Sequence, residues 1–282
     1  CLFSFLIMDF NTKNIQQQYQ GFLNTSLLWA TILEGLEQLS LPSPPTTLFE
    51  GHITQNPRLG KRVESFVSCY LQQCKEIKIL KENIQIQNDK ITVGEIDCLL
   101  LKNHSPVHLE IVYKFYLYDS SIGKSEIEHW IGPNRKDSLQ QKLDKLKNKQ
   151  LPLLYKKECI PLLKQLNLDI NKIQQKVFFK AQLFVPLANH NVVFNQLNSD
   201  CITGFYINQK ELKLFSDCKF YIPKKIDWLL GPNSNVDWLN YSSFENQVSE
   251  ILHHKTAPLC WMKQPNGEIS KFFIVWWKPQ VC

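Results

Sequence analysis

Two acidic residues and a lysine, Asp97, Glu110 and Lys114, stand on neighbouring segments near the middle of the chain. Both segments alternate apolar and polar residues, and the short polar stretch 102–105 separates them, which predicts an antiparallel β-hairpin. Pairing across this stretch places Asp97 opposite Glu110, with Lys114 further along the same face. Facing carboxylates repel each other unless a cation lies between them. The pattern therefore indicates a site for Mg²⁺ or Mn²⁺, which favour oxygen ligands.

A divalent ion at such a pair lowers the pKa of a bound water, and a nearby ammonium stabilises negative charge on a phosphate. Hydrolysis of a phosphodiester is the reaction that this combination favours. The alternative interpretation is a solvated outer face of a sheet, on which acids and a lysine have no chemical role. The hairpin residues by themselves leave both interpretations open.

Hydrophobic periodicity predicts the elements that position these residues. Helices are expected over residues 14–40, 59–73, 136–150, 159–175 and 243–254. Strands are expected over 77–87, 91–101, 107–117, 177–187, 204–207, 219–222 and 272–277. Ser242 and Glu245 have the spacing of a capping box, and Asn266-Gly267 is typical of a tight hairpin turn. The order of elements predicts the α/β class, as an α+β mixed sheet flanked by helices.

Composition sets broad limits on the class of protein. The net charge of +6 is compatible with a polyanionic partner, and 44% hydrophobic residues are enough for a sizeable core. The nine cysteines include no C-x-x-C pair, which argues against structural zinc and favours free thiols in a reducing compartment. No apolar stretch has the length of a membrane span. We therefore expect a cytoplasmic protein without a membrane partner, in which Met8 is the natural start and residues 1–7 are an artefact.

Several other motifs are weaker. Gly123-Lys-Ser125 resembles the end of a phosphate-binding loop, but Tyr118 stands where its first glycine belongs. No G-x-S-x-G or G-x-G-x-x-G motif is present. His253-His254 fit a helix C-terminus better than a metal site. The lysines of 136–150, Trp130 and the Trp276-Trp277 pair are compatible with nucleic-acid contacts, or with a solvated helix face and a packed core.

A set of segments between residues 55 and 155 carries a family resemblance. These segments are Leu59-Gly-Lys-Arg-Val-Glu64, Gly94-Glu-Ile-Asp97, His108-Leu-Glu-Ile-Val-Tyr-Lys-Phe-Tyr-Leu117, Trp130-Ile-Gly-Pro-Asn134 with Asp137, and Lys142. Together they resemble an uncharacterised bacterial family, domain of unknown function eighteen fifty-three. That family is grouped with the PD-(D/E)XK nuclease superfamily, so the resemblance implies a restriction-endonuclease-like core.

The resemblance implies a role for each matching residue. Asp97 and Glu110 would be metal ligands, Glu64 would reach the site from its helix as a further ligand, and Lys114 would be the catalytic lysine. The superfamily motif places its lysine two residues after the acid, where this chain has Val112. Lys114 lies about 7 Å further along the strand. Lys142 on the following helix is the rival source of positive charge.

The resemblance thus implies a Mg²⁺- or Mn²⁺-dependent nuclease that acts on nucleic acid, most naturally DNA. The alternative function is a catalytically inactive nuclease-fold module that binds nucleic acid or a protein partner. The expected domains are an N-terminal helical extension over 1–45, the catalytic core over 50–190 and an α+β region over 191–282. The sequence indicates no particular oligomeric state.

Overall fold

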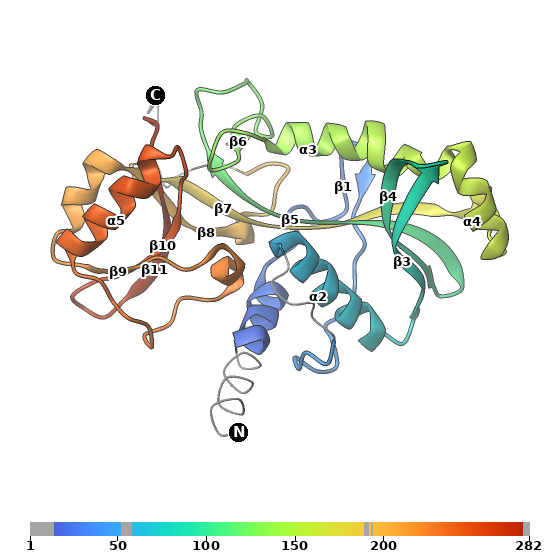
Figure 1. The fold of residues 1–282 in the computed structure, drawn as a ribbon, viewed down its shortest axis with the longest axis horizontal. Coiled ribbons are helices and arrows are strands. Elements are labelled where there is room, and N and C mark those ends of the chain that lie inside the picture. Colours follow the sequence, from blue (N-terminus) through green and yellow to red (C-terminus); the bar gives the residue numbers. More distant parts are fainter. Residues whose placement is uncertain (1–13, 52–57, 189–191, 193, 279–282) are drawn as a thin grey trace. The chain divides into compact units, whose positions relative to one another are not determined.

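The computed structural model describes residues 14–51, 58–188, 192 and 194–278 (Figure 1). The expectations for Met8 and for residues 1–7 lie outside the described residues. The chain forms two compact units. The hairpin unit comprises Leu27–Tyr113 and Gln141–Lys180, and the C-terminal unit comprises Cys1–Ser26, Lys114–Gln140 and Ala181–Cys282. These units interleave along the chain, and the three-part division expected from the sequence stays a prediction.

The hairpin unit is built on three antiparallel strands, β3 (Ile77–Asn88), β4 (Ile91–Lys102) and the first part of β5 (Ser105–Tyr118). Each has the alternating pattern of a strand with one or both faces covered. Helix α2 (Leu59–Gln73) lies on one side of this sheet (Figure 1). Its buried stripe includes Val63, Phe66, Val67 and Tyr70. The predicted helix and all three strands are confirmed.

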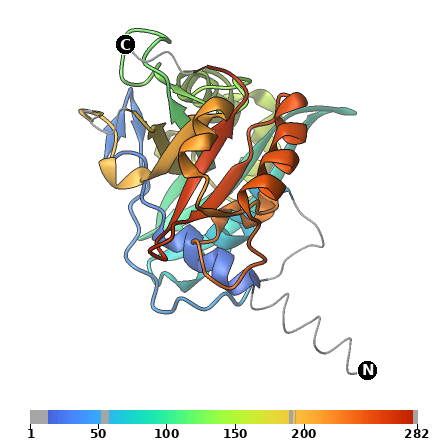
Figure 2. The same cartoon turned by 90° about the vertical axis from the view of Figure 1, so that its left-hand side faces the viewer.

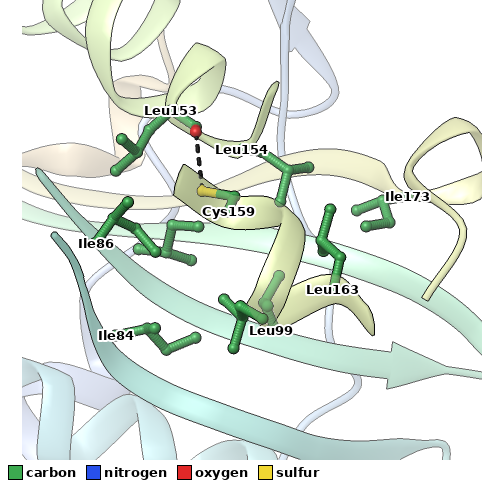
Figure 3. Close-up of a cluster of buried hydrophobic side chains, with 10 residues drawn as sticks. Ile84, Ile86, Leu99, Leu153, Leu154, Cys159, Leu163 and Ile173 are labelled. Atoms are coloured by element: carbon green, nitrogen blue, oxygen red, sulfur yellow. Dashed lines mark hydrogen bonds between the residues drawn. The ribbon is translucent and has the colours of Figure 1, made fainter. Parts of the chain in front are cut away.

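A chain of short helices covers the opposite side of the hairpin unit (Figure 1). It consists of α3 (Leu139–Lys145), the π-helical turn η1 (Leu146–Gln150), the 3-10 turns η2 (Leu151–Tyr155) and η3 (Lys157–Cys159), and α4 (Ile160–Gln165). Figure 3 shows the core between these helices and strands β3 and β4, in which Ile84, Leu99 and Leu163 are buried. The Cys159 thiol donates to the Leu153 carbonyl at 3.1 Å.

Gly94 lets this helical layer approach β4 closely. A Cβ atom at position 94 would lie 2.7 Å from a methyl group of Leu153, which is too close for two carbon atoms. The glycine of the Gly94-Glu-Ile-Asp97 segment therefore has a packing role.

The C-terminal unit holds a mixed sheet. The second part of β7 (Gln174–Pro186) pairs in parallel with β8 (Ile202–Asn208), which pairs in parallel with β11 (Ile269–Val275). Strands β10 (Leu259–Lys263) and β9 (Lys219–Tyr221) continue it in antiparallel order. Helix α5 (Tyr241–His253) packs beside these strands (Figure 2), with the Phe244 ring stacked on Phe220 at 4.2 Å. The predicted mixed α and β class is confirmed.

The shorter elements complete both units. They are β1 (Ile32–Leu33), β2 (Leu36–Glu37), β6 (Trp130–Ile131) and the 3-10 turns η4 (Ile170–Lys172), η5 (Ser199–Cys201), η6 (Gln209–Phe215) and η7 (Lys225–Leu229).

The helix predicted over 14–40 is wrong in its second half. Residues 14–24 are helical, but β1 and β2 then form a small hairpin. Its turn uses Glu34 and Gly35, with φ of 47° and 82°, values that a right-handed helix does not contain. The Trp29 indole donates to the Leu36 carbonyl across this hairpin at 3.2 Å. The leucines of this segment have helical spacing in the sequence, but after residue 24 the backbone that carries them is not helical.

Two further helix predictions need correction. The helix expected over 159–175 stops at Gln165, because Asn167 adopts a left-handed φ of 53° that reverses the chain. The capping box expected at Ser242 and Glu245 is also wrong. The Asn240 side chain caps α5 instead, accepting the Ser243 N–H at 2.9 Å.

Other sequence expectations concern thiols and membrane spans. All seven cysteines in the described part of the chain are free thiols, as expected. Among the described residues, no helix combines the length and the apolar character needed to cross a bilayer.

Truncating Leu99, which is 1% exposed at the centre of the hairpin core, leaves a cavity that the surrounding helices cannot fill. We expect Leu99→Ala to lower the free energy of unfolding by about 2–5 kcal/mol in denaturant titrations. The control is Ile91→Ala on the same strand, where the side chain is 73% exposed. Equal losses for the two variants would contradict this description of the core.

Candidate active site

The β4–β5 hairpin has the predicted register up to the acidic pair. Leu99 pairs with His108, and the ladder ends where Cys98 pairs with Leu109. The turn consists of Asn103 and His104 alone, with φ of 48° and 66°, so it is shorter than the four-residue connection predicted. Beyond this ladder the Asp97 carboxylate accepts the backbone N–H of Ile111 at 2.8 Å. A side chain thus replaces a strand carbonyl at the position of the acidic pair.

Glu110 is completely buried, with an exposed fraction of 0%. Its Oε1 is 2.9 Å from His108 Nε2, and its Oε2 accepts a hydrogen bond from Gln150 Nε2. A buried carboxylate without such donors would be strongly destabilising. The alternative of a solvated sheet face is therefore wrong for Glu110 and for His108, which is also 0% exposed.

The amide of Gln175 fixes the histidine in this network. Its nitrogen donates to the Leu151 carbonyl at 2.6 Å and lies 3.2 Å from His108 Nδ1. Because an amide nitrogen only donates, Nδ1 acts as the acceptor and Nε2 carries the hydrogen that Glu110 receives. His108 Nε2 is therefore placed to donate to the buried carboxylate.

Gln150 links the carboxylate to a cation. Its Oε1 accepts from the Lys142 ammonium at 2.7 Å, while its amide nitrogen donates to Glu110. Gln150 lies at the end of the π-helical turn η1 that continues α3. Such turns widen a helix locally and are frequent at functional sites. The predicted basic helix 136–150 is thus α3 followed by this turn, and it brings Lys142 to the site.

Asp97 has the most perturbed carboxyl group of the hairpin. Burial, followed by the charge of Glu110, raises its pKa to about 7, and the charge of Glu64 acts in the same direction. The Ile111 N–H and the charge of Lys142 oppose this rise. The negative charges of Glu110 and Glu64 therefore both act on Asp97, and Lys142 is the cation that partly compensates them.

Glu64 is held at the edge of the site by a lysine. The Lys61 ammonium donates to Glu64 at 2.7 Å, to Glu95 at 2.8 Å and to Asn83 at 2.9 Å. Asn83 has a left-handed φ of 51° within β3. Burial raises the pKa of Glu64, although its bond to Lys61 opposes the rise. Glu64 therefore influences Asp97 by its charge, while its own carboxylate is paired with Lys61.

Lys114 belongs to the C-terminal unit, although it lies on the same strand as Glu110. Its ammonium donates to Asp137 of that unit at 2.6 Å. The structure thus gives Lys114 a carboxylate partner outside the acidic pair, and its catalytic role stays a prediction.

Four polar residues of the network escaped the sequence analysis as site residues. They are Lys61, His108, Gln150 and Gln175. Gln150 lies eight residues after Lys142, beyond the spacings of three and four that mark neighbours on an α-helix, so the helical pattern did not indicate it. No local signal points to Gln175, because it reaches His108 from a strand far away in the sequence.

The donor set of the hairpin fits a hard divalent cation. Within the described residues no group of three or more His, Cys, Asp or Glu side chains has the arrangement of a metal cage. Zinc normally requires such a cage, whereas Mg²⁺ is commonly bound by one or two carboxylates with waters and substrate phosphates. Asp97 and Glu110 provide carboxylate oxygens of the kind that Mg²⁺ prefers, and the charge of Glu110 acts on Asp97.

The Trp130-Ile-Gly-Pro-Asn134 segment has a structural role in the C-terminal unit. Trp130 is 0% exposed, and the Pro133 carbonyl accepts from the Trp277 indole at 3.2 Å. A Cβ at Gly132 would lie 1.9 Å from the Asp137 carboxylate. The interpretation as packing residues is confirmed for Trp130 and Trp277, whereas Trp276 is 37% exposed.

Comparison with protein-family models identifies the family of this chain. A family model described as Domain of unknown function (DUF1853) matches residues 12–275. The chain belongs to this family. No curated protein and no solved structure matches the DUF1853 chain. The match spans the hairpin network and the C-terminal sheet together.

The raised pKa of Asp97 predicts how the stability of this DUF1853 protein depends on pH. In the absence of divalent ions, the folded state retains the Asp97 proton above the usual pKa of 3.8, up to about 7. The contribution of Asp97 to the free energy of unfolding is therefore fully present at low pH and is lost as the pH rises through about 7. Asn cannot titrate and still accepts the Ile111 N–H.

We therefore compare the free energies of unfolding of Asp97→Asn and the wild type. The difference should shift in favour of Asp97→Asn by at least about 1 kcal/mol when the pH is raised from about 5 to about 8. Urea titrations in a metal chelator measure this difference. A difference that is independent of pH would contradict the raised pKa.

Proposed function

We propose that this protein is a metal-dependent phosphodiesterase that cleaves nucleic acid, most naturally DNA, at the β4–β5 hairpin. The observation that carries the proposal is the pKa of Asp97, which burial and then the charge of the buried Glu110 carboxylate raise to about 7. Carboxyl groups whose pKa is shifted by burial and by a neighbouring charge are typical of sites that bind a cation or transfer protons.

Asp97 and Glu110 would hold Mg²⁺ or Mn²⁺, with Glu64 adding negative charge from α2. The bound ion supplies a water of lowered pKa and neutralises charge on the scissile phosphate. The chain's own contribution is orientation. His108 and Gln150 fix the Glu110 carboxylate, so that it needs no reorganisation when charge develops nearby.

Lys142 is the cation that we assign to the phosphate. It contributes to the electrostatics of Asp97 and is held by Gln150, which also donates to Glu110. Lys114 is engaged by Asp137 in the other unit. The position expected for the superfamily lysine is Val112, and Lys142 supplies the missing charge from the following helix.

Two further observations support a nucleic-acid substrate. The order α2, β3, β4, β5 and α3, with an acid on the helix and acids on two strands, resembles that of PD-(D/E)XK nucleases. The net charge is +6, and Lys145 and Lys149 are exposed on the covering helix, where they would contact a phosphate backbone.

The second candidate function is an inactive nuclease-fold module that binds nucleic acid or a protein partner. Its support is that both oxygens of Glu110 already receive hydrogen bonds, from His108 and Gln150. A metal ion would then have to share or displace these donors. This second function predicts that neither Mg²⁺ nor Mn²⁺ binds at the hairpin.

Purified wild-type protein should degrade linear or single-stranded DNA when Mg²⁺ or Mn²⁺ is present, and a chelator should stop the reaction. We expect Asp97→Asn to lower the rate by at least about a hundredfold, because it removes a charged metal ligand. The matched control is Asp89→Asn, since Asp89 is exposed in the β3–β4 turn and Asn also tolerates its left-handed φ of 53°. Equal rates for Asp97→Asn and the wild type would overturn the proposal.

A pair of lysine variants decides which ammonium serves the reaction. Lys142→Met should lower the cleavage rate by about a hundredfold or more, because it removes positive charge beside Asp97. Lys114→Met should retain most of the activity, since that ammonium pairs with Asp137. Single-turnover rates at saturating metal measure both variants. The opposite ranking would assign the role to Lys114.

A further inference from the structure

A cavity lies within the C-terminal unit, and no residue of the proposed cleavage site lines it. Its volume is about 550 Å³. Its walls come from the helix at residues 14–24, from β7, β8 and β11, and from the turn that follows Leu229. A small polar metabolite fits a volume of this size.

The walls of this cavity are rich in neutral hydrogen-bonding side chains. They include the amides of Gln20, Asn24, Gln182 and Asn233. Such side chains can donate hydrogen bonds to the oxygens of a ligand.

Lys271 is the cation of this cavity. It is only 4% exposed, and its ammonium donates to the Gln182 side chain at 3.1 Å and to the Trp228 carbonyl at 3.0 Å. Both partners are neutral oxygens, and two of the three ammonium donors are used. Burial lowers the pKa of Lys271 to about 7. A buried ammonium without a carboxylate partner is expensive, so the cavity lacks the counter-ion that this lysine would favour.

A glycine lies beside Lys271 on the neighbouring strand. Lys271 on β11 is the register partner of Gly204 on β8, and Gly204 also pairs with Phe184 on β7. A Cβ at Gly204 would lie 2.1 Å from the Lys271 carbonyl and 3.3 Å from the Phe184 ring. The absence of a side chain at position 204 therefore lets β8 approach the β11 backbone closely, and the Lys271 ammonium reaches Gln182 on β7.

We propose that this cavity binds a small polar molecule that carries an oxyanion, either a carboxylate or a phosphate, with Lys271 as its counter-charge and the amides of the cavity wall as hydrogen-bond donors. The carboxylate of Asp200 also lines the cavity, but it is exposed to solvent. It would face a part of the ligand other than the anion. The site is separate from the acidic hairpin and stands whether or not the cleavage activity is found.

Calorimetric titration of the full chain with malonate and, separately, with inorganic phosphate tests this proposal. We expect saturable binding of at least one probe, and the stronger probe identifies the ligand as a carboxylate or a phosphate. Lys271→Met should weaken that binding by at least about tenfold. The control Lys219→Met removes an exposed lysine from β9 and should bind as the wild type does.

A second measurement uses the wild type alone and is therefore independent of how the variants fold. Acetylation of lysines by an activated acetate ester, followed by peptide mass spectrometry, reports how accessible each amine is. The bound probe should slow acetylation of Lys271 by at least about threefold and leave Lys219 unchanged. Absence of binding for both probes, unchanged affinity in Lys271→Met, or unprotected Lys271 would each overturn the proposal.

Discussion

The burial of the Glu110 carboxylate is the constraint on which the hairpin unit depends. A carboxylate at 0% exposure requires donors, and His108 and Gln150 supply them. Gln150 therefore has to reach the sheet from the end of the π-helical turn, which fixes the covering helices over β4 and β5. Gln175 in turn sets the tautomer of His108. The buried carboxylate is thus connected to three polar side chains from three different elements.

The buried charge of Glu110 affects the neighbouring carboxyl group of Asp97. Asp97 is itself largely removed from water and also lies within reach of the Glu110 charge, so its ionisation is opposed and its pKa rises. The same field that disfavours the Asp97 carboxylate would favour a cation beside it. Proton binding and metal binding at Asp97 are therefore competing ways of relieving one repulsion, and each should weaken as the other strengthens.

Much of this fold follows from local sequence patterns, and the site follows only in part. The bounds of α2, the order of β3, β4 and β5, and the pairing of Leu99 with His108 were all predictable, because period and turn length set them. The helix over 14–40 was predicted too long, because its leucines have helical spacing although Gly35 forms a turn. Gln175 was unpredictable, because its contact with His108 depends on tertiary pairing of β7.

The most direct test of the central claim is the pKa of the Asp97 side chain, followed by carbon-13 NMR of its carboxyl group with and without Mg²⁺. Without the ion, the account predicts a pKa raised to about 7 by burial and by the Glu110 charge. Saturating Mg²⁺ should lower this pKa markedly, because the ion binds only the ionised carboxylate. An unperturbed Asp97, or a raised pKa that Mg²⁺ leaves unchanged, would contradict a cation site at this hairpin.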